Sequence, residues 1–260
     1  MINLFRDLAL VSGRAVMTWH RSEGVDYELK ADSSPLSAAD LAAHDIICTG
    51  LRAAYPDIPL VSEENKNQLD PMNLGDRFFL VDPIDGTKSF IKGKDDFTIN
   101  IALIEQGKPT TAVLYAPAMS RLFLADDGRA TEEKISPDGA ISGPVNILKC
   151  GAASKKLRIL ASLSHRDAQT NAFLEDYPHA EIKSVSSSLK FAVMAAGEAD
   201  LYPRFGPTSA WDTAAGQGIL VAAGGVVVEA ESRQNLIYGG RETYLNPGFI
   251  ASVDHGLVKG

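Results

Sequence analysis

The sequence predicts an α/β or α+β protein of two packed halves, and three observations support this fold class. The 260 residues suffice for one large domain or two small ones, either of which can bury a core without disulfides. Short apolar runs typical of strands alternate with segments of helical period. A stretch over 126–144, rich in Gly, Pro, Asp, Glu and Ser, is the best candidate for a connection between halves of about 1–145 and 146–260.

Two helices are predicted at the start of the chain. In 2–20, apolar residues recur at the i, i+3, i+4 and i+7 spacing of one helix face. The second helix opens at Ser37, because Ser37 and Asp40 have the spacing of a capping box. Tyr55-Pro56-Asp57 ends it, since proline cannot continue the helical hydrogen bonding.

Strands and helices are predicted in turn over the remaining chain. Apolar runs predict strands over 58–61, 78–81, 97–105, 111–115 and 122–125, with a turn at Gly107-Lys108-Pro109. Beyond the polar connection, we expect strands over 157–161, 182–185, 200–202 and 226–229, and helices over 167–177, over 189–196 and from about Asp212. The chain has no internal repeat.

Composition and charge exclude several classes of protein. With 45% hydrophobic and 22% charged residues, the chain is neither disordered nor a coiled coil. A net charge of -8 repels phosphate backbones and argues against a nucleic-acid polymer as partner. Two cysteines outside any Cys/His cluster argue against zinc, and the most apolar stretch, 219–228, is too short to span a bilayer. With no signal-peptide pattern, a cytoplasmic protein is expected.

Acidic residues mark the place where chemistry is expected. Five of them follow predicted strands or open a predicted helix: Glu63, Glu64, Asp82, Asp85 and Asp212. Taken singly, each is typical of a surface acid, a turn or an N-cap. Together they lie where α/β sheets place ligands, and Pro83 stiffens the turn between Asp82 and Asp85. Converging carboxylates need cations between them, and all-oxygen ligation selects Mg²⁺ or Mn²⁺.

Three motifs resemble the signatures of a known family. Val61-Ser-Glu-Glu64, Asp82-Pro-Ile-Asp-Gly-Thr87 and Trp211-Asp-Thr-Ala-Ala-Gly216 are similar to those of the inositol-monophosphatase-like, lithium-sensitive, Mg²⁺-dependent phosphatases. The resemblance covers essentially the whole chain. It implies a layered αβαβα sandwich of the sugar-phosphatase type, with both halves forming one catalytic unit.

Within the family, the chain resembles the CysQ-type 3'(2'),5'-bisphosphate nucleotidases. The further likeness lies in Lys30-Ala-Asp-Ser-Ser-Pro35, Asp85-Gly-Thr-Lys-Ser-Phe-Ile-Lys92, Phe97-Thr-Ile-Asn-Ile-Ala-Leu103, Ser187-Ser-Leu-Lys190, Leu201-Tyr-Pro-Arg-Phe-Gly-Pro207 and Leu245-Asn-Pro-Gly-Phe249. This resemblance implies a place in sulfur metabolism and a nucleoside bisphosphate as substrate. It also leaves room for peripheral attachment to the inner membrane.

The resemblance assigns roles residue by residue. It implies two or three Mg²⁺ ions, with Mn²⁺ as a substitute, held by Glu63, Asp82, the Ile84 carbonyl, Asp85 and Asp212. It makes Asp40, Glu64 and Thr87 the catalytic residues that orient and deprotonate the attacking water. It places the substrate against Glu63, Ile84, Asp85, Gly86, Thr87, Ser187, Lys190, Arg204 and Asp212, with Ser164-His165 near the ribose.

The reaction expected from this resemblance is hydrolysis of the 3'(2')-phosphate of adenosine 3'(2'),5'-bisphosphate to AMP and phosphate by metal-activated water. Two alternatives stay open. The chain could be an inositol monophosphatase or related sugar-phosphate phosphatase with the same metal site, or a degenerate relative that binds metal or nucleotide without turnover. Lys190 and Arg204 could equally be ordinary surface cations. A monomer or a homodimer fits the sequence.

Overall fold

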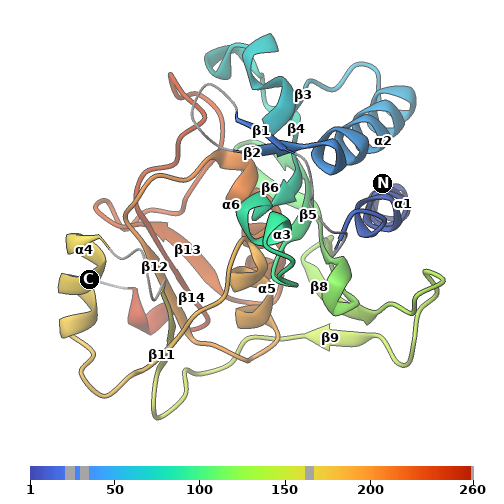
Figure 1. Ribbon diagram of the computed structural model, residues 1–260. Coiled ribbons are helices and arrows are strands. Elements are labelled where there is room, and N and C mark those ends of the chain that lie inside the picture. Colours follow the sequence, from blue (N-terminus) through green and yellow to red (C-terminus); the bar gives the residue numbers. More distant parts are fainter. Residues whose placement is uncertain (21–26, 30–34, 162–166, 259–260) are drawn as a thin grey trace.

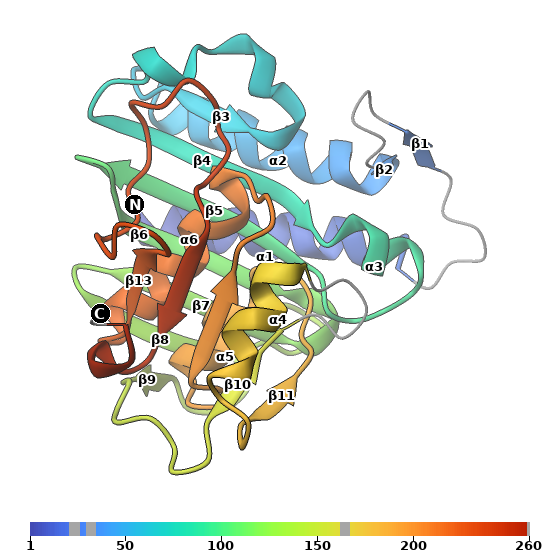
Figure 2. The same cartoon turned by 90° about the vertical axis from the view of Figure 1, so that its left-hand side faces the viewer.

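The computed structural model describes residues 1–20, 27–29, 35–161 and 167–258, and it has five layers (Figures 1 and 2). Helices α1 (Ile2–Met17) and α2 (Ala38–Ala54) cover one face of a seven-stranded sheet. Helices α5 (Leu189–Ala195) and α6 (Ala210–Ala222) lie between this sheet and a five-stranded one, and α4 (Ala168–Glu175) packs outside. The expected αβαβα sandwich is confirmed.

The seven-stranded sheet carries the first part of the chain in sequence order. Its strands are β3 (Leu60–Ser62), β4 (Arg77–Asp85), β5 (Thr98–Glu105), β6 (Lys108–Ala116), β7 (Arg121–Asp126), β8 (Arg129–Lys134) and β9 (Asn146–Leu148). β3 and β4 are parallel, and the other neighbours are antiparallel. β4 runs four residues beyond the predicted strand end, so that Asp82 and Asp85 lie within it.

The five-stranded sheet is mixed. In spatial order its strands are β11 (Glu181–Lys183), β10 (Arg158–Leu160), β12 (Leu201–Arg204), β14 (Phe249–Ser252) and β13 (Val226–Glu229). β14 was not predicted. It pairs antiparallel with both β12 and β13, and all four of its residues are buried. A central strand buried on both faces lacks the alternating pattern that distinguishes a strand from a short apolar loop.

Shorter elements complete the structure. They are the hairpin β1 (Tyr27–Leu29) and β2 (Pro35–Ser37), the short helix α3 (Thr87–Ile91), and the 3-10 turns η1 (Glu63–Gln68), η2 (Pro71–Asn73), η3 (Pro117–Met119) and η4 (His255–Leu257). The turn predicted at 107–109 is tighter than expected. Gln106 and Gly107 form it with φ angles of 51° and 76°, the conformation of a two-residue hairpin loop.

The polar stretch over 126–144 is not wholly a connection, which corrects one prediction. It contains β8, which pairs with β7 over six residues. The acidic pair Glu132 and Glu133 is buried there, and each carboxylate meets an arginine: Arg121 Nε at 2.6 Å and Arg6 Nε at 2.8 Å. Composition alone misses this strand because the arginines that pair its buried charges lie on other elements, β7 and α1. The division of the chain near residue 145 stays a prediction.

The layer between the sheets is tightly packed. A Cβ added at Gly216 of α6 would lie 2.5 Å from the Phe191 ring, so glycine lets α5 and α6 approach closely. Phe191 in turn stacks on Phe249 of the small sheet, with ring centroids 5.7 Å apart. Buried apolar residues of both sheets and these two helices belong to one cluster. The elements that carry the acidic motifs are therefore fixed to one core.

Replacing Asp200 by alanine should lower the free energy of unfolding by about 3 kcal/mol. Its carboxylate is 2% exposed and accepts Nη2 of Arg158 at 2.8 Å, so truncation leaves a partly buried guanidinium without its partner. Burial would raise the pKa of Asp200, but hydrogen bonds from Arg158 and Ser154 outweigh it and lower the pKa to about 2. The wild-type contribution is therefore complete above pH 3.8 and disappears as pH falls towards 2.

Urea unfolding at pH 7 and at pH 2 measures this effect. The wild-type protein and the variant should differ at pH 7 and converge at pH 2. Asp45→Ala, an exposed acid on α2, serves as the control and should match the wild type at both pH values. An Asp200→Ala midpoint equal to that of the wild type at pH 7 would contradict the prediction.

Candidate active site

The carboxyl end of β4 carries the centre of the site. Asp82 pairs with Asn100 of β5 and Asp85 with Thr98, and the register shifts between the two pairs. The bulge adds a residue on the β4 side and turns successive carboxylates toward one region. Asp82 is 1% exposed, and its Oδ1 has no hydrogen-bond partner among the described residues. A buried carboxylate oxygen without a partner is costly unless the group takes up a proton or a cation.

Four of the other five predicted acids lie around Asp82. Burial raises its pKa well above the usual range, and the nearby charges of Glu63, Asp85, Asp212 and Asp40 raise it further. Burial likewise raises the pKa of Asp212 to about 8, with Asp85 and Glu63 adding to the effect. The structure thus brings together five acids that are up to 172 positions apart, from Asp40 to Asp212. Their mutual repulsion favours a bound cation.

Asp85 is held by the chain that leads into α5. Its Oδ2 accepts the Ser187 hydroxyl at 2.8 Å and the Ser188 amide at 2.5 Å. Ser187 has a φ of 63°, a left-handed conformation that is uncommon for serine. These bonds lower the pKa of Asp85, although burial outweighs them and the net shift is upward. The predicted site residues Asp85 and Ser187 are therefore in direct contact.

Sequence reasoning missed the residues that fix this contact. Thr98 Oγ1 lies 2.5 Å from Ser187 Oγ and 2.7 Å from Ser188 Oγ, and Ser188 also donates to Asn100 Oδ1 at 2.7 Å. These four buried or half-buried polar side chains form one network beneath Asp85. The available signal was the motif Phe97-Thr-Ile-Asn, which places two polar residues on one face of an apolar strand.

Asp40 and Thr87 form a second contact at the same site. Asp40 is the third residue of α2 and closes a capping box with Ser37, whose amide donates to Asp40 Oδ2 at 2.9 Å. Thr87 Oγ1 lies 3.2 Å from Asp40 Oδ1 and 3.0 Å from the Ile84 carbonyl oxygen. Both oxygens compete for the one hydroxyl proton of Thr87. Glu64 lies beside Glu63 at the start of η1, partly exposed.

Gly86 begins α3 in a conformation that suits glycine. Its φ is 92°, and an added Cβ would lie 3.4 Å from Ser187 Cβ and 3.5 Å from the Asp96 carbonyl oxygen. The carbonyl of Gly86 accepts the amides of Ser89 and Phe90, at 2.7 and 3.0 Å. The chain therefore turns sharply between the acids of β4 and the first turn of α3, where backbone amides suit an anion.

The residues present fit a hard divalent cation. Within the described residues, no three Asp, Glu, His or Cys side chains are already arranged as a metal cage. Mg²⁺ rarely requires one, because it keeps several waters and takes one or two carboxylates together with substrate phosphate oxygens. The unpartnered Oδ1 of Asp82 and the acids around it supply such oxygen ligands.

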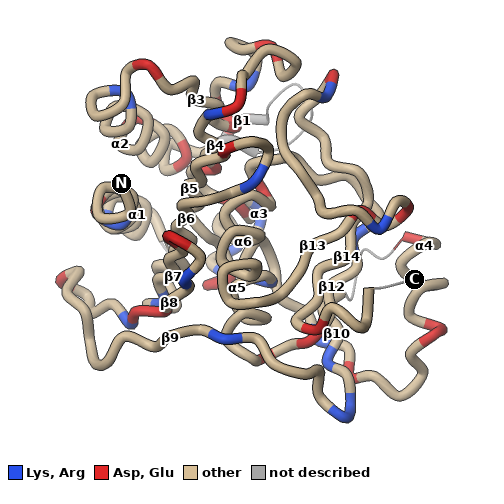
Figure 3. The backbone as a smooth tube through the Cα atoms, turned by 180° about the vertical axis from the view of Figure 1, so that it is seen from behind, with Lys and Arg blue, Asp and Glu red and all other residues tan. Residues whose placement is uncertain are grey.

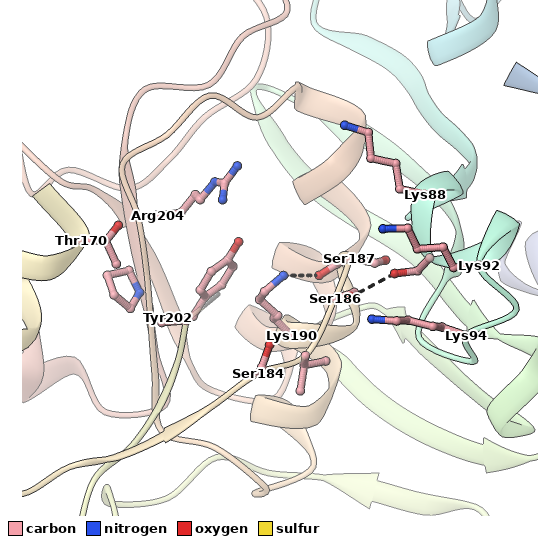
Figure 4. A pocket seen from close by; sticks show the side chains of 14 residues that line it. Lys88, Lys92, Lys94, Thr170, Ser184, Ser186, Ser187, Lys190, Tyr202 and Arg204 are labelled. Atoms are coloured by element: carbon pink, nitrogen blue, oxygen red, sulfur yellow. Dashed lines mark hydrogen bonds between the residues drawn. The ribbon is translucent and has the colours of Figure 1, made fainter. Parts of the chain in front are cut away.

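A basic cavity of about 370 Å³ adjoins the acids (Figure 4). Lys190 lies in it, donates to the Ser187 carbonyl at 3.1 Å and sits over the Tyr202 ring at 5.1 Å. Burial lowers the pKa of Lys190 to about 8, against the attraction of Asp85. Arg204 donates to the Pro207 carbonyl at 3.1 Å, and its buried Nε has no partner among the described residues.

Three further lysines line this cavity and were not predicted as site residues: Lys88, Lys92 and Lys94. Their spacing after the acidic motif was the available signal, since all follow Gly86 within eight residues.

The predicted pair Ser164-His165 lies outside the described residues. Elsewhere, acidic and basic residues occur together on some elements, such as α1, α2 and β8 (Figure 3). No helix in the described part of the chain has the length and apolarity needed to cross a bilayer.

Comparisons with known proteins show which family the chain is similar to. The model of the family described as "Inositol monophosphatase family" matches residues 1–258. A protein of Salmonella typhimurium named 3'(2'),5'-bisphosphate nucleotidase CysQ is 42% identical, over 97% of this chain and 100% of its own. One of the same name from Haemophilus influenzae is 30% identical, over 96% and 91%. The crystal structure of CysQ from Bacteroides thetaiotaomicron superimposes with a TM-score of 0.83, at 34% identity and 96% coverage of both chains.

Proposed function

The chain belongs to the inositol monophosphatase family, and on that premise we propose that it is a Mg²⁺-dependent phosphatase. Its substrate is adenosine 3'(2'),5'-bisphosphate, which reacts with water at the 3'(2')-phosphate to give AMP and inorganic phosphate. The reaction breaks one P–O ester bond and needs no co-reactant besides water. The similar proteins that bear the name 3'(2'),5'-bisphosphate nucleotidase support this substrate.

One observation carries the proposal: an acidic cluster and a basic cavity meet at Ser187. The Ser187 hydroxyl donates a hydrogen bond to the Asp85 carboxylate. The Ser187 carbonyl oxygen accepts a hydrogen bond from the Lys190 ammonium group. A substrate with one phosphate at the acids, where cations bind, and a second phosphate in the basic cavity satisfies both environments. A substrate with a single phosphate satisfies only one of them.

We assign the cation ligands to the acids around Asp82. Glu63, Asp82 and the Ile84 carbonyl would hold one Mg²⁺, and Asp82, Asp85 and Asp212 a second. When bound, Mg²⁺ neutralises charge on the phosphoryl oxygens and lowers the pKa of the attacking water. Asp212 is kept in place by its own helix end, because its Oδ2 accepts the Ser209 amide at 2.8 Å.

The remaining residues act on water and phosphate. The carboxylate of Asp40 accepts a hydrogen bond from the Thr87 hydroxyl. The oxygen of Thr87 can then accept a hydrogen bond from the attacking water. Glu64, partly exposed at the start of η1, takes the proton of that water as general base. The amides of Gly86 and Thr87 bind the reacting phosphate, and the left-handed Gly86 allows this close approach.

Phosphate release from a panel of substrates tests the proposal. With Mg²⁺ present, kcat/KM should be highest for adenosine 3',5'-bisphosphate, well above inositol 1-phosphate and fructose 1,6-bisphosphate. A preference for inositol 1-phosphate would make the chain an inositol monophosphatase instead. Release from none of the three, together with tight AMP binding, would indicate a nucleotide-binding relative without turnover.

A further inference from the structure

The lysines at the rim of the cavity come from one short segment. Lys88 lies on α3, and Lys92 and Lys94 lie on the turn that follows it. Figure 4 shows their amino groups facing Lys190 and Arg204 across the cavity. The segment is held in shape by backbone hydrogen bonds, with the Gly93 amide on Phe90 O at 2.9 Å and the Lys94 amide on Ser89 O at 3.0 Å. The three charges therefore have fixed origins on one side of the opening.

The charges of these lysines are exposed and are not engaged by the described acids. All three are exposed, and none forms an ion pair with a carboxylate of the described residues. The described residues that line the cavity include five cations and no Asp or Glu. In a chain of net charge -8, such a concentration of positive charge is unexpected unless it receives an anion.

The two inner cations are already in contact with the protein. Lys190 donates to the Ser187 carbonyl oxygen and Arg204 to the Pro207 carbonyl oxygen, each at 3.1 Å. The attraction that an incoming anion meets at the outer side of the cavity comes from Lys88, Lys92 and Lys94.

We propose that Lys88, Lys92 and Lys94 bind the phosphate of the substrate that does not react, and that they thereby make the enzyme prefer bisphosphates to monophosphates. This inference rests on the proposed function. The same segment begins at Gly86 and Thr87, which we assign to the reacting phosphate. A link from Ser89 Oγ to Ser186 Oγ, 3.4 Å long, joins it to the opposite wall. One rigid segment therefore sets the separation of the two phosphate sites.

Charge removal with a matched pair of substrates tests this inference. Adenosine 3',5'-bisphosphate and adenosine 3'-monophosphate share the reacting phosphate and differ by the 5'-phosphate. We expect Lys→Gln at each position to lower kcat/KM for the bisphosphate about two- to fivefold, as for an exposed charge pair. The triple variant should lose about tenfold or more and should keep kcat/KM for the monophosphate within about twofold.

Inhibition by AMP gives a second readout, which reports binding of the 5'-phosphate apart from the chemical step. AMP carries only the 5'-phosphate, so its inhibition constant should rise in the triple variant by about the same factor as the bisphosphate loss. The inhibition constant of adenosine should not change. Lys149→Gln, an exposed lysine outside the cavity, controls for the loss of one charge in each single variant and should change none of these values.

The outcomes separate this inference from the proposed function. If the wild type hydrolyses neither nucleotide, the proposed function fails. If the wild type prefers the bisphosphate and the triple variant retains that preference, the three lysines do not bind the second phosphate and the inference is wrong. Equal losses on both nucleotides would assign the lysines to the reacting phosphate or to the fold, which melting temperatures distinguish, and would also overturn the inference.

Discussion

Replacing Asp82 by asparagine should abolish turnover, with kcat lowered by at least about a thousandfold, or roughly 4 kcal/mol of transition-state stabilisation. Asp82 lies at the centre of the acids, and its buried Oδ1 is the atom that lacks a partner within the described protein. Asparagine has nearly the same shape but cannot supply the negative charge that holds two cations. Phosphate release at saturating Mg²⁺ measures the loss.

The same substitution should not unfold the protein. Burial and the neighbouring acids raise the pKa of Asp82, so its ionised form destabilises the cation-free fold. We therefore expect the melting temperature of Asp82→Asn in EDTA to equal or exceed that of the wild type. The stabilisation of the wild type by added Mg²⁺ should shrink in the variant. Wild-type turnover in Asp82→Asn, or wild-type turnover in excess EDTA, would contradict the metal assignment.

Truncating Lys190 or Arg204 to alanine should lower kcat/KM for adenosine 3',5'-bisphosphate about ten- to a hundredfold each. A hydrogen bond to a charged group contributes roughly 1.5–3 kcal/mol, which corresponds to that range. Both cations line the cavity beyond Ser187 and not the acidic cluster itself. Inositol 1-phosphate has no group that reaches this cavity, so its kcat/KM should be largely spared. Part of the loss should appear in kcat, because remote binding energy orients the reacting phosphate.

Two controls make this result specific. Lys156→Ala removes an exposed lysine of the same half of the chain and should leave both substrates unchanged. Circular dichroism and melting temperature report whether the cavity variants fold. Equal losses on both substrates would mean that Lys190 and Arg204 support the fold or the acidic cluster. Unchanged kinetics on both would make them ordinary surface cations.

The acidic part of the site was predictable because each of its motifs is a short, continuous stretch of sequence. Glu63, Asp82 and Asp212 follow strands or open a helix, and strand ends meet at one edge of a sheet. The capping box formed by Ser37 and Asp40 was also predicted, from the spacing of these two residues. The fold class followed from the alternation of strand and helix periods, and the layered form from resemblance.

The rest depends on contacts between distant segments. The network of Thr98, Asn100 and Ser188 exists because the register of β4 and β5 places it beneath Asp85, and no local pattern specifies that register. β8 was not predicted because its buried acids are neutralised by arginines outside the strand, Arg121 on β7 and Arg6 on α1. The rim lysines were not singled out because exposed lysines on a short helix are common.

Asp40 and Asp212 each occupy the third position of a helix that opens with a serine, and each closes a capping box there. The carboxylates are consequently in position before any ligand arrives, since the helix ends already restrain them. The capping box gives each acid a structural use apart from catalysis, so the presence of Asp40 and Asp212 in a relative is weaker evidence of turnover than the presence of Asp82.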